Sequence, residues 1–190
     1  PFPIRPYQAK SAKAILSKFK EFQSTLAVQP TGTGKTVLAA EIIRKTNHGR
    51  AMFLAPRNKL VNQAVQAIER HTGENVSVEM NTYWADTNMW NHSRIVASTV
   101  QTQYSGQGGQ GRMTRFDPDK FSLLVVDEAD MYLAPRWRQV VDYYKQNKDL
   151  KVLAVTATPD RRDEQALAQL VDSYIEPYEI RDAVKDGWLT

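Results

Sequence analysis

The sequence predicts an α/β fold in which helices cover both faces of a parallel β-sheet. Short, continuously apolar runs recur along the 190 residues, and segments with helical spacing of apolar residues follow four of them. Continuous apolar runs are typical of strands buried on both faces, and their alternation with helices is typical of the doubly wound class. The predicted strands are TLAV (25–28), AMFLA (51–55), VSVEM (76–80), RIVAS (94–98), LLVVD (123–127) and VLAVT (152–156).

Helices are predicted after the first, second, fifth and sixth strands. They cover about 35–46, 58–71, 136–147 and 163–171, where apolar residues recur at helical spacing. The apolar positions are Val37, Leu38, Ile42 and Ile43 in the first helix, and Leu60, Val61, Ala64, Val65 and Ile68 in the second. Two stretches break the pattern. Residues 81–93 are polar with three aromatic residues, and residues 104–118, with four glycines, predict a flexible loop.

Composition excludes several classes of function. The chain has no cysteine, which excludes disulfides and thiolate metal sites, and its three histidines (His48, His71 and His92) show no ligand spacing. The formal net charge of +4 is compatible with a polyanionic partner. Neither a membrane-spanning run nor a signal pattern is present in the sequence, so we expect no membrane partner and a cytoplasmic protein.

The segment VQPTGTGKT (28–36) predicts a phosphate-binding loop between a strand and a helix. Gly32 and Gly34 let backbone N–H groups approach a phosphate, and the dipole of the following helix favours an anion. Lys35 offers a charge to the β- and γ-phosphates, and the Thr36 hydroxyl suits Mg²⁺. The usual pattern, G-x-x-x-x-G-K-[ST], begins with glycine, whereas this chain has Gln29. The residues expected to bind the nucleotide are Pro30, Thr31, Gly32, Thr33, Gly34, Lys35 and Thr36.

The segment DEAD (127–130) follows the apolar strand LLVV directly. A carboxylate at the end of a parallel strand lies at the edge of the sheet where the phosphate loop also lies. Asp127 is therefore expected to hold Mg²⁺, directly or through water, and Glu128 to orient and polarise the attacking water. The alternative is a solvated acidic strand end. A guanine-specific site is disfavoured, because neither NKDL (147–150) nor NKLV (58–61) completes N-K-x-D.

Six motifs in this order resemble the first RecA-like domain of superfamily 2 helicases and translocases. The resemblance covers about residues 2–186 and is greatest for the branch of restriction-enzyme motor subunits and their DNA-repair relatives. Asp130 departs from that branch, which more often has histidine at this position. The motifs are IRPYQ (4–8), PTGTGKT (30–36), LAPRNKLVNQ (54–63), ASTVQT (97–102), DEAD (127–130) and VTATP (155–159).

The resemblance implies a role for further residues around the nucleotide. Gln8 would bind the N6 and N7 edge of adenine, and Arg5 would stack on or flank the base. The alternative for both is a helix start with proline in its first turn. Thr156 and Thr158 would couple the ATP site to the nucleic-acid face, and the alternative is β-branched residues that end a strand.

The same resemblance places Pro56, Arg57, Ser98 and Thr99 on a nucleic-acid face, where they would contact phosphates without recognising sequence. For Arg57 the alternative is a solvated helix start. The resemblance favours DNA over RNA.

Two tryptophans in the polar stretch 81–93 have two interpretations. Trp84 and Trp90 can stack on bases, or they can pin their loop to the core. We favour the second interpretation from the sequence.

The resemblance implies a motor made of two domains. We expect residues 1–180 to form the ATP-binding domain and residues 181–190 to begin the linker to a second RecA-like domain of the same polypeptide. That domain would supply arginine fingers, so the first domain alone should hydrolyse ATP very slowly.

The leading hypothesis is an ATP hydrolase that uses Mg²⁺ and moves on nucleic acid. The alternatives are a DEAD-box RNA helicase, an ATP-dependent switch or phosphotransferase without a nucleic-acid substrate, and a nonenzymatic binding module.

Overall fold

The computed structural model describes residues 3–87, 93–106, 111–157 and 160–190. Within these ranges one sheet of seven parallel strands has the order β3-β4-β2-β5-β6-β1-β7. The strands are β1 (Ser24–Val28), β2 (Arg50–Ala55), β3 (Val76–Glu79), β4 (Ile95–Thr99), β5 (Phe121–Asp127), β6 (Lys151–Thr156) and β7 (Ser173–Tyr174). The helices are α1 (Pro6–Lys18), α2 (Lys35–Lys45), α3 (Asn58–Thr72), α4 (Val100–Tyr104), α5 (Pro135–Tyr144), α6 (Arg161–Leu170) and α7 (Ile180–Lys185).

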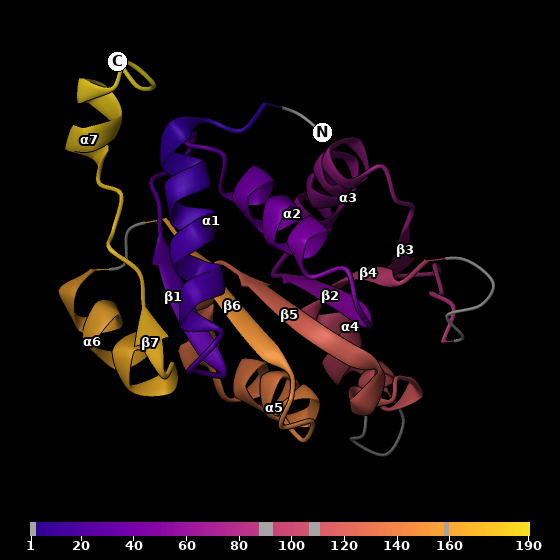
Figure 1. Cartoon of the computed structure of the whole chain (residues 1–190). Coiled ribbons are helices and arrows are strands. Elements are labelled where there is room, and N and C mark those ends of the chain that lie inside the picture. The colour runs from indigo at the N-terminus through magenta and orange to yellow at the C-terminus, as the bar shows by residue number, and fades with distance from the viewer. Residues whose placement is uncertain (1–2, 88–92, 107–110, 158–159) are drawn as a thin grey trace.

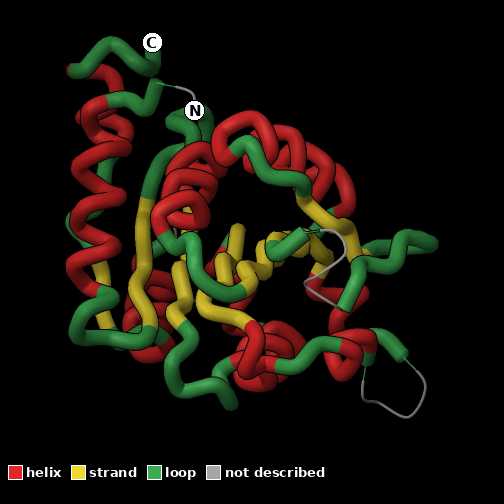
Figure 2. Tube along the Cα trace, turned by 45° about the vertical axis from the view of Figure 1, so that its right-hand side comes forward, coloured by secondary structure: helices red, strands yellow, loops and turns green. Residues whose placement is uncertain are grey.

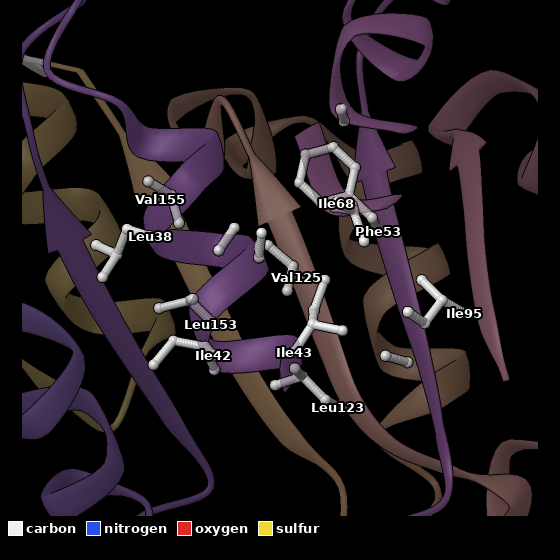
Figure 3. Close-up of a cluster of buried hydrophobic side chains, with 14 of the residues drawn as sticks. Leu38, Ile42, Ile43, Phe53, Ile68, Ile95, Leu123, Val125, Leu153 and Val155 are labelled. Atoms are coloured by element: carbon white, nitrogen blue, oxygen red, sulfur yellow. The ribbon is translucent and has the colours of Figure 1, made fainter. Parts of the chain in front are cut away.

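Helices lie on both faces of the sheet, which confirms the doubly wound prediction (Figure 1). One apolar core packs α1, α2 and α3 on one face, and a second core packs α4, α5 and α6 on the other. Figure 3 shows the first core, in which Leu38, Ile42 and Ile43 of α2 lie over Val125 and Leu153 of the sheet. Successive residues of the central strands point to opposite faces and are buried on both, which explains their unbroken apolar runs.

The parallel arrangement brings the chemically important motifs to one edge of the sheet. Val28, at the end of β1, pairs with Thr156, and Asp127 pairs with Val155. Ala55, at the end of β2, pairs with Thr99 at the end of β4. The loops that follow these strands therefore meet at their carboxyl ends, where open α/β sheets bind ligands.

The six predicted strands and four predicted helices are present, with bounds that shift by up to three residues. The edge strand β7 was missed because two residues, Ser173 and Tyr174, carry no detectable pattern. The segment YEIRDAVKDGWLT (178–190), which the resemblance interprets as a last strand and helix, contains α7 but no strand, and the final strand β7 lies before it.

The predicted flexible loop at 104–118 is also wrong in its described part. Arg112–Arg115 and Pro118–Lys120 form short 3-10 helices, and Met113 and Phe116 are buried. None of the helices in the described ranges has the length and apolar character needed to cross a membrane.

Candidate functional site

The predicted phosphate loop turns at two glycines that have left-handed backbone conformations. Gly32 and Gly34 both have a φ of +84°, and Gly34 is the N-cap of α2. The dihedral angle of Gly34 favours glycine, and a Cβ atom built there would lie 2.5 Å from Nε2 of Gln8 and would displace that amide. The loop is closed by a 2.6 Å hydrogen bond from the Thr33 hydroxyl to the carbonyl of Pro30. Lys35 and Thr36 form the first turn of α2, whose N–H groups lack partners inside the helix.

Gln29, the departure from the usual motif, has a structural role beneath the loop. Its side chain is fully buried and its Nε2 donates to the Ser11 hydroxyl of α1 over 3.1 Å. Its backbone N–H donates to the Thr156 carbonyl over 2.9 Å. The residue therefore ties the loop to α1 and β6 rather than facing a phosphate. The substitution leaves the phosphate-facing part of the motif intact.

The acidic motif lies directly beside the phosphate loop. Nζ of Lys35 is 3.2 Å from Oε1 of Glu128, and the two side chains are 13% and 33% exposed. Glu128 has a φ of +52°, a left-handed conformation that costs a non-glycine residue roughly 1–2 kcal/mol. Such strain is typical of functional sites.

Asp127 is buried under Glu128 at the end of β5. Burial raises the pKa of the Asp127 carboxyl, and the nearby charge of Lys35 opposes that rise. Oδ1 of Asp127 accepts a 3.0 Å hydrogen bond from the backbone of Glu128. The charge of Lys35 only partly offsets the burial of the Asp127 carboxylate, so this position suits a cation.

The residues present fit Mg²⁺ bound together with a nucleotide. The Thr36 hydroxyl and the Asp127 carboxylate are oxygen donors, and Mg²⁺ commonly takes one or two protein oxygens and completes its shell with water and phosphates. Across the described ranges, no group of three or more His, Cys, Asp or Glu side chains forms a metal cage. A site that depends on the nucleotide for its remaining ligands is consistent with that composition.

A hydrogen bond links the acidic motif to the last of the six motifs. The Thr156 hydroxyl of β6 donates to Oδ1 of Asp130 over 3.1 Å. Asp130 was noted from the sequence only as a departure from the nearest branch, and its partner could not be foreseen. Thr158 lies outside the described residues. The bond joins the two motifs directly, and a coupling role for Thr156 stays a prediction.

The N-terminal motif packs against the phosphate loop. Gln8 is buried, and its Nε2 donates to the carbonyls of Thr33 and Gly34 over 3.2 and 3.3 Å. Its Oε1 accepts a 2.8 Å bond from the backbone of Arg5 at the start of α1. Arg5 and Gln8 therefore do lie at a helix start with proline in its first turn, as the alternative interpretation states. The contact of Gln8 with adenine stays a prediction. The Tyr7 hydroxyl also donates to the Thr33 carbonyl, a contact that no sequence pattern indicated.

The C-terminal segment folds back over this motif. Figures 1 and 2 show α7 beside the N-terminal end of α1. The Tyr178 ring stacks on Tyr7 with centroids 4.1 Å apart, and the Arg5 guanidinium lies 4.4 Å from the centre of the Trp188 ring. Leu189 lies next to Gly32. Residues 178–189 thus border the nucleotide side of the domain, and a role of residues 181–190 as the start of a linker stays a prediction.

The four residues expected on a nucleic-acid face differ in their exposure. Arg57 is exposed as the N-cap of α3, and Pro56 beside it is partly exposed. Ser98 and Thr99 are buried, and their hydroxyls are engaged within the fold. The Ser98 hydroxyl donates to the Glu79 carbonyl over 2.7 Å, and the Thr99 side chain caps α4. A phosphate contact by these four residues stays a prediction, and the accessible part of that surface is the Pro56–Arg57 corner.

Trp84 does not pin its loop to the core, so the interpretation favoured from the sequence is wrong for this residue. Its side chain is 61% exposed. The Arg112 guanidinium lies 3.6 Å from the centre of its ring. Trp90 lies outside the described residues.

Comparison with known sequences identifies one family over most of the chain. The model of the family described as "Type III restriction enzyme, res subunit" matches residues 1–161. The chain is 26% identical over 196 residues to a putative mitochondrial ATP-dependent helicase, irc3, of Schizosaccharomyces pombe, which covers 98% of this chain and 31% of irc3. It is 35% identical over 174 residues to the ATP-dependent DNA helicase mph1 of Neurospora crassa, which covers 83% of this chain and 14% of mph1. The chain therefore spans less than a third of either relative.

Solved helicase structures share the fold. The helicase domain of Hef from Pyrococcus furiosus superposes with a TM-score of 0.71 at 23% identity, over 95% of this chain and 39% of that one. The Type ISP restriction-modification enzyme LlaGI, solved with a DNA substrate mimic, gives 0.69 at 17% identity, over 98% and 21%. Dbp5 of Saccharomyces cerevisiae, solved with RNA and ADP BeF3, gives 0.68 at 18% identity, over 91% and 46%.

Proposed function

Since the chain belongs to the family of type III restriction enzyme Res subunits and carries the first RecA-like domain of a superfamily 2 helicase, we propose that it is the ATP-binding half of a nucleic-acid motor. In this proposal ATP hydrolysis drives movement along nucleic acid, or its unwinding. The observation that carries the proposal is the 3.2 Å contact between Lys35 of the phosphate loop and Glu128 of the acidic motif. This contact places the lysine of the predicted phosphate loop beside the carboxylate that is the candidate for activating water.

Each side chain of the site has one task in this proposal. The loop amides and Lys35 hold the β- and γ-phosphates. Thr36 and Asp127 hold Mg²⁺, which supplies charge neutralisation on the phosphates when it is bound. Glu128 then orients the water that attacks the γ-phosphate and accepts its proton.

The ion pair between Lys35 and Glu128 would compete with a bound triphosphate for the lysine. While the pair is closed, Glu128 is held by Lys35 and is not free to orient water. A triphosphate offers Lys35 a more highly charged partner and so releases the carboxylate. Water activation would therefore follow nucleotide binding rather than precede it.

Coupling requires a second domain in this account. We propose that a second RecA-like domain of the same polypeptide completes the site with arginine side chains, which are worth roughly 10³–10⁵ in rate. The 190-residue chain should then bind Mg·ATP but turn it over slowly. Rapid turnover by this chain alone, abolished by Glu128→Gln, would contradict that expectation.

We propose DNA rather than RNA as the track. The support is that mph1, the relative at 35% identity, is named a DNA helicase. The fold does not discriminate, because the LlaGI and Dbp5 structures, one with a DNA mimic and one with RNA, resemble this chain equally. A cytoplasmic location stays a prediction, and irc3 is named as mitochondrial.

Nucleotide binding by the chain tests the first step. Titration of a fluorescent ATP analogue in Mg²⁺ should give saturable binding to the wild type and a large loss for Lys35→Ala. Lys45→Ala is the matched control, because Lys45 is an exposed lysine at the far end of the same helix. Equal binding by all three proteins would refute the assignment of the loop.

A further inference from the structure

A tight turn after β3 holds two aromatic side chains in solvent. Met80 and Tyr83 exchange backbone hydrogen bonds of 3.1 and 2.8 Å, and Asn81 between them has a φ of +53°. Tyr83 is 64% exposed and Trp84, which follows it, is 61% exposed. Tyrosine and tryptophan are enriched at interfaces, so two of them exposed on one turn mark a candidate contact surface.

A buried carboxylate fixes this turn. Glu79 has no exposed surface, and its carboxylate accepts hydrogen bonds from Arg112 over 2.7 Å, from Arg115 over 2.5 Å and from the Ala85 backbone over 2.6 Å. Removing charges from water is costly unless they are paired in this way. The network contributes little apolar burial, and its consequence is a rigid segment 79–85.

The two arginines also hold the backbone on both sides of the tryptophan. Arg112 donates to the carbonyls of Asn81 and Tyr83 over 2.8 and 2.6 Å. Arg115 donates to the carbonyl of Ala85 over 3.0 Å. The segment that carries Trp84 is therefore bound at three carbonyls and loses little freedom when a ligand binds.

Much of the indole is left accessible. The guanidinium carbons of Arg112 and Arg115 lie 3.6 and 4.8 Å from the ring centre. With both groups this close, the Trp84 side chain is still 61% exposed. The two arginines therefore leave ring surface free for a ligand to contact.

The turn adjoins the accessible part of the predicted nucleic-acid face. Nδ2 of Asn58 is 3.4 Å from Oδ1 of Asn81, and Asn58 follows the exposed Arg57 at the start of α3. Glu79 pairs with Ser98, so the turn leaves the carboxyl edge of the sheet together with the loops after β2 and β4. A strand whose phosphates lie on the start of α3 would pass beside the turn that carries the exposed Trp84.

We propose that Trp84 is a base-stacking platform for an unpaired nucleotide of the bound strand. The inference rests on the proposed function and adds a site to it, because the predicted contacts at Pro56 and Arg57 involve phosphates alone. The exposed ring accepts any base, since every base has a π-face. Arg112 and Arg115 hold the ring in place, and each of them also donates to Glu79 and to carbonyls of the turn. Tyr83 borders the same turn and is left in place in the test.

A four-way comparison tests the platform. The 190-residue chain and its Trp84→Ala variant are titrated, at low ionic strength where phosphate contacts are strongest, with a labelled single strand and with the same strand made abasic. Stacking on one base predicts that Trp84→Ala weakens binding of the normal strand by about 5- to 140-fold. The abasic strand should bind the wild type as weakly as the normal strand binds the variant, with no further loss for the variant. Tyr174→Ala is the matched control, because Tyr174 is 67% exposed on β7 at the opposite edge of the sheet.

The outcomes separate the platform from the proposed function. If the wild type binds the normal strand and Trp84→Ala binds it equally well, the platform is refuted and the nucleic-acid face stands. An equal loss on normal and abasic strands would show that Trp84 acts through the fold or as a protein contact, and would also refute base stacking. If the wild type binds neither strand while it still binds ATP, nucleic-acid binding by this domain fails, and the platform fails with it.

Discussion

Replacing Glu128 by glutamine should tighten ATP binding while it slows hydrolysis. Nζ of Lys35 is 3.2 Å from Oε1 of Glu128, so a bound triphosphate and the carboxylate would compete for the same ammonium group. Glutamine keeps the shape of the side chain and can still accept a weaker hydrogen bond, but it carries no charge. The triphosphate can then bind Lys35 without breaking an ion pair. The substitution also removes a negative charge that would repel the triphosphate.

The expected size follows from the exposure of the pair. An exposed ion pair is worth about 0.2–1 kcal/mol, and breaking a buried one costs about 3–5 kcal/mol. With side chains 13% and 33% exposed, this pair lies between the two classes, and we discount it to about 1–2 kcal/mol for solvent screening. The dissociation constant for Mg·ATP should fall about 5- to 30-fold in Glu128→Gln.

Titration of a fluorescent ATP analogue measures this change directly. Glu21→Gln is the matched control, because Glu21 is an exposed acid between α1 and β1. It lies at the amino ends of the strands, whereas Lys35 and Glu128 follow their carboxyl ends. It removes the same charge and should leave the dissociation constant unchanged. Weaker or unaltered binding in Glu128→Gln would refute the idea that the carboxylate competes for Lys35.

Three other predictions concern the stability of the fold. The side-chain hydrogen bond from Arg44 lowers the pKa of the buried Glu41 from 4.5 to about 2. The charged Glu41 therefore stabilises the fold fully above pH 4.5, and this contribution is lost as the pH falls through 2. The free energy of unfolding, measured with urea, should fall by about 3 kcal/mol over that range in the wild type but not in Glu41→Gln. Glu79→Ala breaks a buried ion network and should lower the Tm by about 6–20 °C in thermal unfolding, whereas a shift of 2 °C would show that the network is not stabilising. Burial raises the pKa of Asp127, so the charged form opposes folding at neutral pH. Asp127→Asn should leave the Tm without nucleotide unchanged or a few degrees higher and should remove any Tm increase caused by Mg·ATP, and a lower Tm without nucleotide would contradict this.

The sequence predicted the layers of the fold because the signals for them are local. A strand buried on both faces must be apolar at every position, as 123–126 is, and a helix over a sheet must repeat its apolar residues every three or four positions. Neither signal exists for β7, where two residues are too few for a pattern. The fixed part of 104–118 was missed for a different reason. Arg112 and Arg115 look like solvated charges until Glu79, more than thirty residues away in the chain, is found beside them.

The candidate site was predictable where motifs end strands. Lys35 and Glu128 are far apart in sequence, yet parallel strands bring both to one edge. Exposure was not predictable in the same way. Ser98 is polar at the end of a strand, but whether its hydroxyl faces solvent depends on Glu79 and Gln103, which use it. The positions of Gln29 and Trp188 depend on α1 and the C-terminal segment, and no motif records such contacts.

The central claim is that this domain couples ATP hydrolysis to nucleic acid. The most direct measurement is the steady-state ATPase rate of the full polypeptide without polymer and with single-stranded DNA, duplex DNA or RNA, with Glu128→Gln as the blank. DNA should raise the rate well above that without polymer, and the blank should stay inactive with every polymer. Equal rates in all four conditions would contradict the motor and leave a nucleotide switch.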